Sequence, residues 1–154
     1  MKVGAIVYFW SMKIVVPSSA EELKMYYDLR FEMLRKPWNR PYTSTIDEDE
    51  NNSVHALMLD ENGKGVAAGR LVLNSDIEGQ VRSMAVAQGL QGKGLGTKIL
   101  KHLEDEARKK NFRHIVLDAR EGAVAFYKKN GYNPEGDSYI LFGVIPHVRM
   151  KKIL

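Results

Sequence analysis

The sequence predicts an α+β fold in three layers, with helices flanking both faces of a mixed, mostly antiparallel central sheet. Hydrophobic periodicity and turn residues give the element order β-α-β-β-β-α-β-α-β-β. This order combines strands joined by short turns with two helical crossovers, and crossovers place helices against a sheet. The chain of 154 residues is expected to form one domain, residues 1–154, because that length can bury a hydrophobic core.

The first part of the chain predicts an edge strand followed by a helix. Residues 1–11 contain a short apolar run without a signal-peptide cleavage site, so they are either an N-terminal extension or an added strand. A strand is expected at 13–16. Ser19 and Glu22 match a capping box, which predicts a helix start, and the proline-containing stretch 36–41 ends that helix.

The middle of the chain predicts a loop and three strands. Four consecutive acids at 47–50 indicate a solvated loop. The apolar runs 53–60 and 65–73 flank the turn residues 61–64, which is typical of a hairpin. A further strand is expected at 80–87.

An amphipathic helix is predicted from Leu95, because apolar residues recur every four positions along it. Its exposed side carries the charge pairs Glu104–Arg108 and Glu106–Lys110, which we expect to form ion pairs. The remaining elements are a strand, a short helix ended by a glycine and two closing strands, at residues 114–119, 122–130, 138–144 and 147–153.

The most informative stretch is the glycine-rich turn between the strand at 80–87 and the following helix. Such a turn leaves several backbone N–H groups unpaired at the positive end of the helix dipole, which favours an anion, typically a phosphate. A P-loop would need a glycine where Ala87 stands, and a dinucleotide fingerprint would need a small residue at Thr97. What remains is the pattern Gln91-x-x-Gly94-x-Gly96.

This pattern resembles the Q/R-x-x-G-x-G/A motif of the GNAT acetyltransferase superfamily, whose element order is also the one predicted here. The resemblance implies that the turn holds the pyrophosphate of acetyl-CoA. The residues that it assigns to this role are Gln91, Gly92, Lys93, Gly94, Leu95, Gly96 and Thr97.

Two further segments are similar to GNAT enzymes. Residues 82–86 resemble the fourth GNAT strand, which implies that Met84, Ala85 and Val86 pair with the pantetheine arm and that a backbone N–H there polarises the thioester. Residues 123–132 resemble the A-x-x-F-Y-x-x-x-G-F/Y segment near the thioester. This likeness makes Phe126 a cofactor contact and Tyr127 the acid that protonates the leaving thiolate; otherwise Tyr127 is a packing residue.

Segments 29–38 and 144–147 are similar to the small bacterial ElaA-like subgroup, whose substrates are poorly defined. The acceptor site therefore stays open. Four arginines are either acceptor-site residues or ordinary ion-pair partners, namely Arg30, Arg35, Arg82 and Arg120. Trp38 and Tyr42 either line an acceptor loop or pack in a turn. The candidates for the general base are Glu78, Asp118, His147 or a water chain.

Composition narrows the functional classes. The absence of Cys excludes disulfides, a Cys nucleophile and thiolate metal sites, and it fits a reducing, cytoplasmic location. The four His residues have no metal-ligand spacing, so no metal is expected. A net charge of +4 suits an anionic ligand, but no basic tract indicates nucleic acid, and no apolar run is long enough for a membrane span.

The sequence thus predicts an N-acetyltransferase that uses acetyl-CoA as cosubstrate and an unidentified amine as acceptor. Without a Cys to carry the acetyl group, direct attack in a ternary complex is expected. One alternative is a non-catalytic CoA-binding sensor or regulatory module of the same fold. Another is a basic domain that binds nucleic acid or protein. The acyl chain length and a homodimer are left open.

Overall fold

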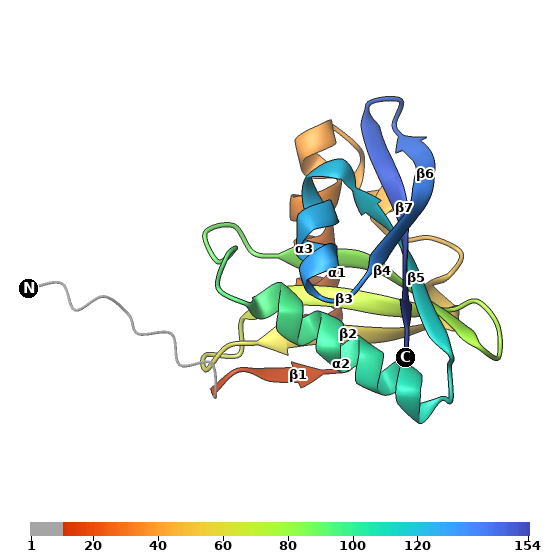
Figure 1. Ribbon diagram of the computed structural model, residues 1–154. Coiled ribbons are helices and arrows are strands. Elements are labelled where there is room, and N and C mark those ends of the chain that lie inside the picture. Colours follow the sequence, from red (N-terminus) through yellow and green to blue (C-terminus); the bar gives the residue numbers. More distant parts are fainter. Residues whose placement is uncertain (1–10) are drawn as a thin grey trace, which may run out of the picture.

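The computed structural model describes residues 11–154 and contains a seven-stranded sheet with the order β1-β2-β3-β4-β5-β7-β6 (Figure 1). All neighbouring strands are antiparallel except β4 and β5. The strands are β1 Lys13–Val15, β2 Ser53–Leu59, β3 Gly65–Leu73, β4 Glu78–Val86, β5 His114–Arg120, β6 Asn133–Leu141 and β7 Ile145–Ile153. The helices are α1 Ala20–Leu34, α2 Leu95–Lys109 and α3 Val124–Lys129. The alternatives for residues 1–11 concern a segment that lies almost entirely outside the described residues.

The helices cover both faces of the sheet, as predicted: α1 lies behind it and α2 and α3 lie in front of it (Figure 1). Successive strand residues alternate between two hydrophobic clusters. Met58 belongs to the cluster that contains the α2 residues Ile99 and Leu103, whereas its neighbour Leu57 belongs to the cluster that contains Tyr26 of α1. This alternation is the period-2 pattern of a sheet that is buried on both sides.

The capping box at the start of α1 is confirmed. The Glu22 backbone N–H donates to Ser19 Oγ at 3.1 Å, and the Ser19 N–H donates to Glu22 Oε1 at 3.3 Å. The helix ends at Leu34, and a short 3₁₀ turn follows at Lys36–Trp38 with Pro37 in its first turn. Both boundaries follow from local chemistry, which is why the sequence located them.

The last hairpin differs from the prediction. Strand β6 begins at Asn133, and the chain turns at Phe142 and Gly143, which have φ of 55° and 73°. The predicted joint at 145–146 instead lies inside β7. Strand β6 is an exposed edge strand with two register irregularities, so it lacks the apolar alternation that would have revealed its start.

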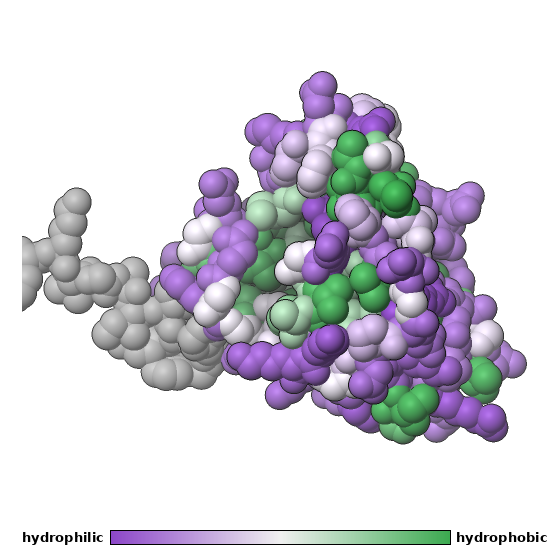
Figure 2. Space-filling model, turned by 45° about the horizontal axis from the view of Figure 1, so that its top comes forward, coloured by the Kyte–Doolittle hydropathy of each residue, from purple (hydrophilic) through white to green (hydrophobic). Residues whose placement is uncertain are grey.

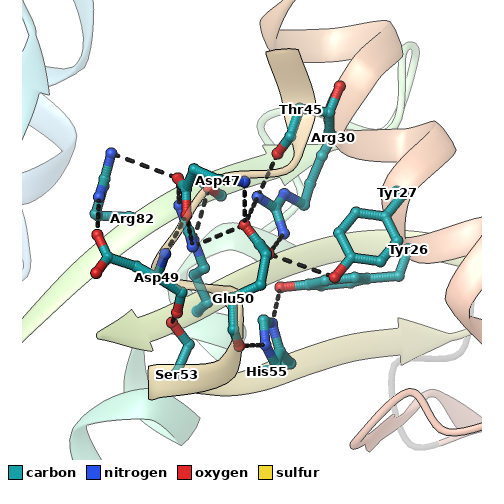
Figure 3. A network of polar contacts seen from close by, with 12 residues as sticks. Tyr26, Tyr27, Arg30, Thr45, Asp47, Asp49, Glu50, Ser53, His55 and Arg82 are labelled. Atoms are coloured by element: carbon teal, nitrogen blue, oxygen red, sulfur yellow. Dashed lines mark hydrogen bonds and ion pairs between the residues drawn. The ribbon is translucent and has the colours of Figure 1, made fainter. Parts of the chain in front are cut away.

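The prediction of a solvated loop at 47–50 is wrong for most of its acids (Figure 3). Glu50 accepts hydrogen bonds from Arg30 at 2.6 Å and from Arg70 at 2.9 Å, and Asp47 is also paired with Arg70. Both arginines are 1 % exposed, so each must have a carboxylate partner. The acidic run folds inward because the sheet buries two cations next to it.

The predicted ion pairs along α2 are also wrong. Glu104 is 3 % exposed and accepts hydrogen bonds from Tyr132 at 2.9 Å and Lys152 at 3.0 Å. Arg108 and Glu106 pair at i,i+3 spacing with Asp105 and Lys109 instead. A carboxylate on the buried side of the helix thus joins α2 to the C-terminal strands.

Strand β4 contains an irregularity that shapes the centre of the molecule. Ser83 has a φ of 57°, and the β3–β4 register shifts opposite it. Arg70 Nε donates to Ser83 Oγ at 3.1 Å, which fixes this bulge to the buried ion-pair network. Bulges bend a strand, and the parallel pairing of β4 with β5 covers only Glu78–Gln80. Beyond that point the two strands separate.

Candidate active site

A cavity of about 830 Å³ lies where β4 and β5 separate. Its walls come from the second half of β4, the glycine turn, the end of β5 and α3, and Tyr139 and His147 contribute from β6 and β7. The space-filling view shows a hollow with apolar side chains inside and hydrophilic side chains around its rim (Figure 2). The cavity is large enough for a cofactor-sized ligand.

The glycine turn forms one end of this cavity. Gly89, Gly92 and Gly94 all have positive φ, between 76° and 83°, and a Cβ added at any of them would meet no atom within 4 Å. Gly94 is the N-cap of α2 and offers no side chain to the first helical N–H groups, which leaves them available to a ligand. The Gln91 side chain shapes the turn, because it accepts from the Gly89 N–H and donates to the Val86 carbonyl, both at 3.1 Å.

Most of the predicted cofactor-binding residues lie together in the walls of the cavity. They are Met84, Ala85, Val86, Gln91, Gly92, Gly94, Leu95, Gly96, Thr97 and Phe126. Lys93 does not line the cavity; it is exposed on the turn. At Gly96 an added Cβ would stand 3.4 Å from the Phe126 ring, so the glycine lets α2 and α3 approach closely.

Tyr127 also lines the cavity, although it is 8 % exposed. Its ring packs edge-on against Phe126 and Tyr132, with centroid distances of 5.0 and 5.8 Å. Burial raises the pKa of Tyr127 to about 12, and the nearby charge of Arg120 acts in the opposite direction. The hydroxyl has no hydrogen-bond partner among residues 11–154. It is a protonated donor that is available to a ligand.

Two of the candidate bases are already engaged with other groups. Glu78 lies at the start of β4, outside the cavity walls, and accepts from His114 and Asn74, each at 2.9 Å. Asp118 lines the cavity, but its carboxylate accepts hydrogen bonds from three side chains, one of which is the cation Arg149. These donors are Ser138 at 2.7 Å, Arg149 at 3.2 Å and Gln80 at 3.2 Å.

His147 differs from both carboxylates. It is 5 % exposed, lines the cavity and stacks on Tyr139, with ring centroids 4.6 Å apart and planes at 12°. Its Nδ1 lies 2.9 Å from the Ile145 carbonyl oxygen, which can only accept, so Nδ1 carries the proton. In the neutral ring this leaves Nε2 with a free lone pair, and the part of the chain that the structure describes gives Nε2 no partner.

The four candidate arginines fall into two groups. Arg30 belongs to the buried network outside the cavity, and Arg82 lines the cavity but pairs with Asp49 at 3.0 Å. Arg35 and Arg120 line the cavity and have no carboxylate partner among the described residues.

The two candidate aromatic residues lie outside the main cavity. Trp38 borders a smaller neighbouring pocket, and Tyr42 donates to Asp28 at 2.9 Å. Tyr139 does line the cavity, but the sequence analysis missed it because an exposed edge strand carries no motif.

Comparison with known proteins identifies the family. The model of the Acetyltransferase (GNAT) family matches residues 23–132 of this chain. The chain belongs to the GNAT acetyltransferase family. A relative in Bacillus subtilis, the uncharacterized N-acetyltransferase YjcF, is 36% identical over 141 residues, which cover 92% of this chain and 99% of the relative. The protein is therefore an acyl-CoA-dependent acetyltransferase.

Solved structures confirm the GNAT fold. Escherichia coli ElaA matches with a TM-score of 0.77 and 24% identity over 92% of this chain and 97% of its own. An aminoglycoside 6'-N-acetyltransferase complexed with coenzyme A matches with a TM-score of 0.77 and 14% identity over 92% and 96%. Within residues 11–154, no helix has the length and apolar character to cross a membrane, and no group of acids and histidines could hold a metal.

Proposed function

We propose that this protein transfers the acetyl group of acetyl-CoA directly to an amine, with both substrates bound in the cavity between β4 and β5. The observation that carries the proposal is the placement of a proton donor and a proton acceptor in one cavity with an anion-binding turn. Tyr127 supplies the donor, the Nε2 lone pair of His147 supplies the acceptor, and the turn around Gly94 receives the pyrophosphate.

In this proposal, each step of the reaction is assigned to one group in the cavity. The amine nitrogen forms a bond to the acetyl carbon while the carbon–sulfur bond breaks. His147 Nε2 accepts the proton that the amine loses, and the Tyr127 hydroxyl gives its proton to the departing sulfur. A backbone N–H on the edge of β4 that faces β5, within residues 84–86 beyond the β4–β5 pairing, polarises the carbonyl oxygen. The tyrosinate regains a proton from the imidazolium or from solvent.

The same features support binding of acetyl-CoA in this cavity. The open space at the positive-φ glycines admits phosphate oxygens close to backbone N–H groups, and the unpaired edge of β4 offers hydrogen bonds to an extended amide chain. A location in the cytoplasm would supply this donor and agrees with the absence of Cys.

The first test is thermal unfolding with and without acetyl-CoA. A ligand that binds only the folded state stabilises it by about 2.7 kcal/mol at a hundredfold excess over its Kd, which raises the Tm by roughly 5–10 °C for a domain of this size. Identical melting curves at millimolar acetyl-CoA would contradict the cofactor assignment.

The second test is a screen of amines for acetylated products by mass spectrometry. It separates the enzyme from the regulatory module of the same fold. Stabilisation by acetyl-CoA without transfer to any amine in the panel would favour the regulatory module.

A further inference from the structure

Arg35 and Arg120 stand apart from the other arginines of the described chain. Every other arginine in residues 11–154 that is buried or half-buried pairs with a carboxylate: Arg30, Arg70, Arg82 and Arg149. Arg35 and Arg120 are half-buried as well, yet they make hydrogen bonds only to backbone carbonyl oxygens. Arg35 also lies over the Phe142 ring, with Cζ 5.5 Å from the ring centroid, but neither arginine has a negatively charged partner among the described residues. A half-buried cation of this kind is further stabilised by a ligand that provides a counter-charge.

The two guanidinium groups also converge. Arg35 Nη1 and Arg120 Nη2 donate to the same oxygen, the Leu34 carbonyl, at 3.1 and 3.3 Å. They reach it from different elements, since Arg35 follows α1 and Arg120 ends β5. Burial lowers the pKa of Arg35, and the charge of Arg120 lowers it further, as expected for neighbouring like charges. The Nη2 group of Arg35 and the Nη1 and Nε groups of Arg120 have no hydrogen-bond acceptor within residues 11–154, so they remain available as donors.

This pair meets at the C-terminal end of α1, next to the proposed chemistry, whereas Gly94 begins α2 on the other side of the sheet (Figure 1). Arg120 is close enough to Tyr127 for its charge to oppose the rise in that pKa, and both arginines act in the same way on Tyr139. The acid in the same cavity, Asp118, is neutralised by Arg149. The part of the cavity beside α1, where we place the acceptor, therefore has two positive charges without a carboxylate partner among residues 11–154, while Gly94 lies in the turn expected to bind the CoA phosphates.

We propose that the acceptor is an amine that also carries an oxyanion group, a carboxylate or a phosphate, and that Arg35 and Arg120 bind this group. The inference rests on the proposed function. Guanidinium groups present planar pairs of N–H donors that match the two oxygens of either anion. With the anion held there, the amine of a small molecule is kept in the cavity where Tyr127 and His147 act.

The test compares acceptors that differ only in the anion. Amino acids are assayed against their α-carboxamides, and phosphoethanolamine is assayed against ethanolamine. We expect kcat/KM to favour one class of anionic acceptor at least tenfold, and the class that is favoured distinguishes carboxylate from phosphate. Arg120→Ala and Arg35→Ala should each reduce that preference tenfold or more, whereas Arg113→Ala, an exposed arginine outside the cavity, should leave it unchanged.

Calorimetric binding of the same acceptors to the CoA-saturated protein tests the anion site separately from the proposed acetyl transfer. Binding of an anionic amine that Arg120→Ala abolishes, without acetyl transfer, would support the anion site and count against the proposed function. Efficient acetylation of uncharged amines, with a preference that neither arginine variant alters, would overturn the anion site and leave the proposed function standing. The anion site would also be overturned if the protein neither bound the anionic amines nor acetylated them in preference to their uncharged counterparts. Arg35→Lys and Arg120→Lys, which keep the charge but lose the planar pair, should retain part of the preference.

Discussion

Replacing Tyr127 by Phe tests the proposed mechanism most directly. The ring contacts with Phe126 and Tyr132 do not involve the hydroxyl, which has no hydrogen-bond partner in residues 11–154. The substitution therefore removes one oxygen without leaving a buried group unpaired, and the free energy of unfolding should change by less than about 1 kcal/mol. Any large loss of activity would then come from the chemistry.

The expected size of that loss follows from the pKa. Burial raises the pKa of Tyr127 to about 12, whereas a thiol ordinarily has a pKa of about 8.5. Full proton transfer from the phenol to the free thiolate would be uphill by about 3.5 pKa units, or about 5 kcal/mol at about 1.4 kcal/mol per unit. The hydroxyl thus acts mainly by donating as negative charge develops on sulfur. We expect kcat to fall about 100-fold, at the low end of general acid catalysis.

The assay is kcat with saturating acetyl-CoA and the best acceptor, together with the Kd of acetyl-CoA, which should not change. A general acid with a pKa of about 12 also predicts that the wild-type rate does not decline up to about pH 10. The matched control is Tyr132→Phe, which removes a hydroxyl bonded to Glu104 and should lower stability but not kcat. A loss of less than about threefold in Tyr127→Phe would mean that water protonates the thiolate and that Tyr127 only packs.

Three further predictions concern the turn, the bulge and the buried ion pairs. Gly94→Asp should abolish binding of acetyl-CoA because it puts negative charge among the helix N–H groups. Gly94→Ala has the same strain from positive φ but no charge, so it should bind acetyl-CoA far better. Equal Kd values for the two variants would mean that the phosphates bind elsewhere. Ser83→Ala should lower the free energy of unfolding, measured with urea, by about 1–3 kcal/mol because buried Arg70 Nε loses its acceptor. Ser83→Gly should lower it less because glycine relieves the strain of the positive φ. The reverse order would refute this account of the bulge. Burial alone would raise the pKa of Asp47, but Arg70 outweighs it and holds that pKa well below its ordinary 3.8. Asp47 therefore adds stability above about pH 4 that is lost as the pH falls. Asp47→Asn should make the free energy of unfolding depend less on pH in the acid range, and an unchanged dependence would contradict the pairing.

The fold was largely predictable because its signals are local. The capping box at Ser19, the hairpin turn at 61–64 and the glycine turn each depend on residues a few positions apart. The start of β6 was not predictable, since an exposed edge strand has no buried face to impose an alternating pattern.

The site and the buried ion-pair network outside it were only partly predictable, because both depend on contacts that no local pattern shows. Glu50 pairs with Arg30 and Arg70, which are each 20 positions away, so the acidic run gave no sign of its burial. The motifs pointed to the glycine turn and to Tyr127, which both line the cavity. The free Nε2 of His147 depends on a hydrogen bond within β7, which the sequence does not reveal.

The short pairing between β4 and β5 has a consequence for the stability of the sheet. Within residues 11–154, the backbone ladder between the four N-terminal strands and the three C-terminal ones covers only Glu78–Gln80. The other contacts between the two groups of strands are made by side chains, among them Gln80 with Asp118, those packed against α2, and the buried pair of Glu104 with Lys152. A ligand between β4 and β5 contacts both groups of strands and so joins them. Acetyl-CoA should therefore slow amide hydrogen exchange in β5 and β7 as well as in the residues it touches. If acetyl-CoA binds between β4 and β5 as proposed, each release of product would remove these contacts, so the gap that admits the substrate would also limit the stability of the sheet at this point.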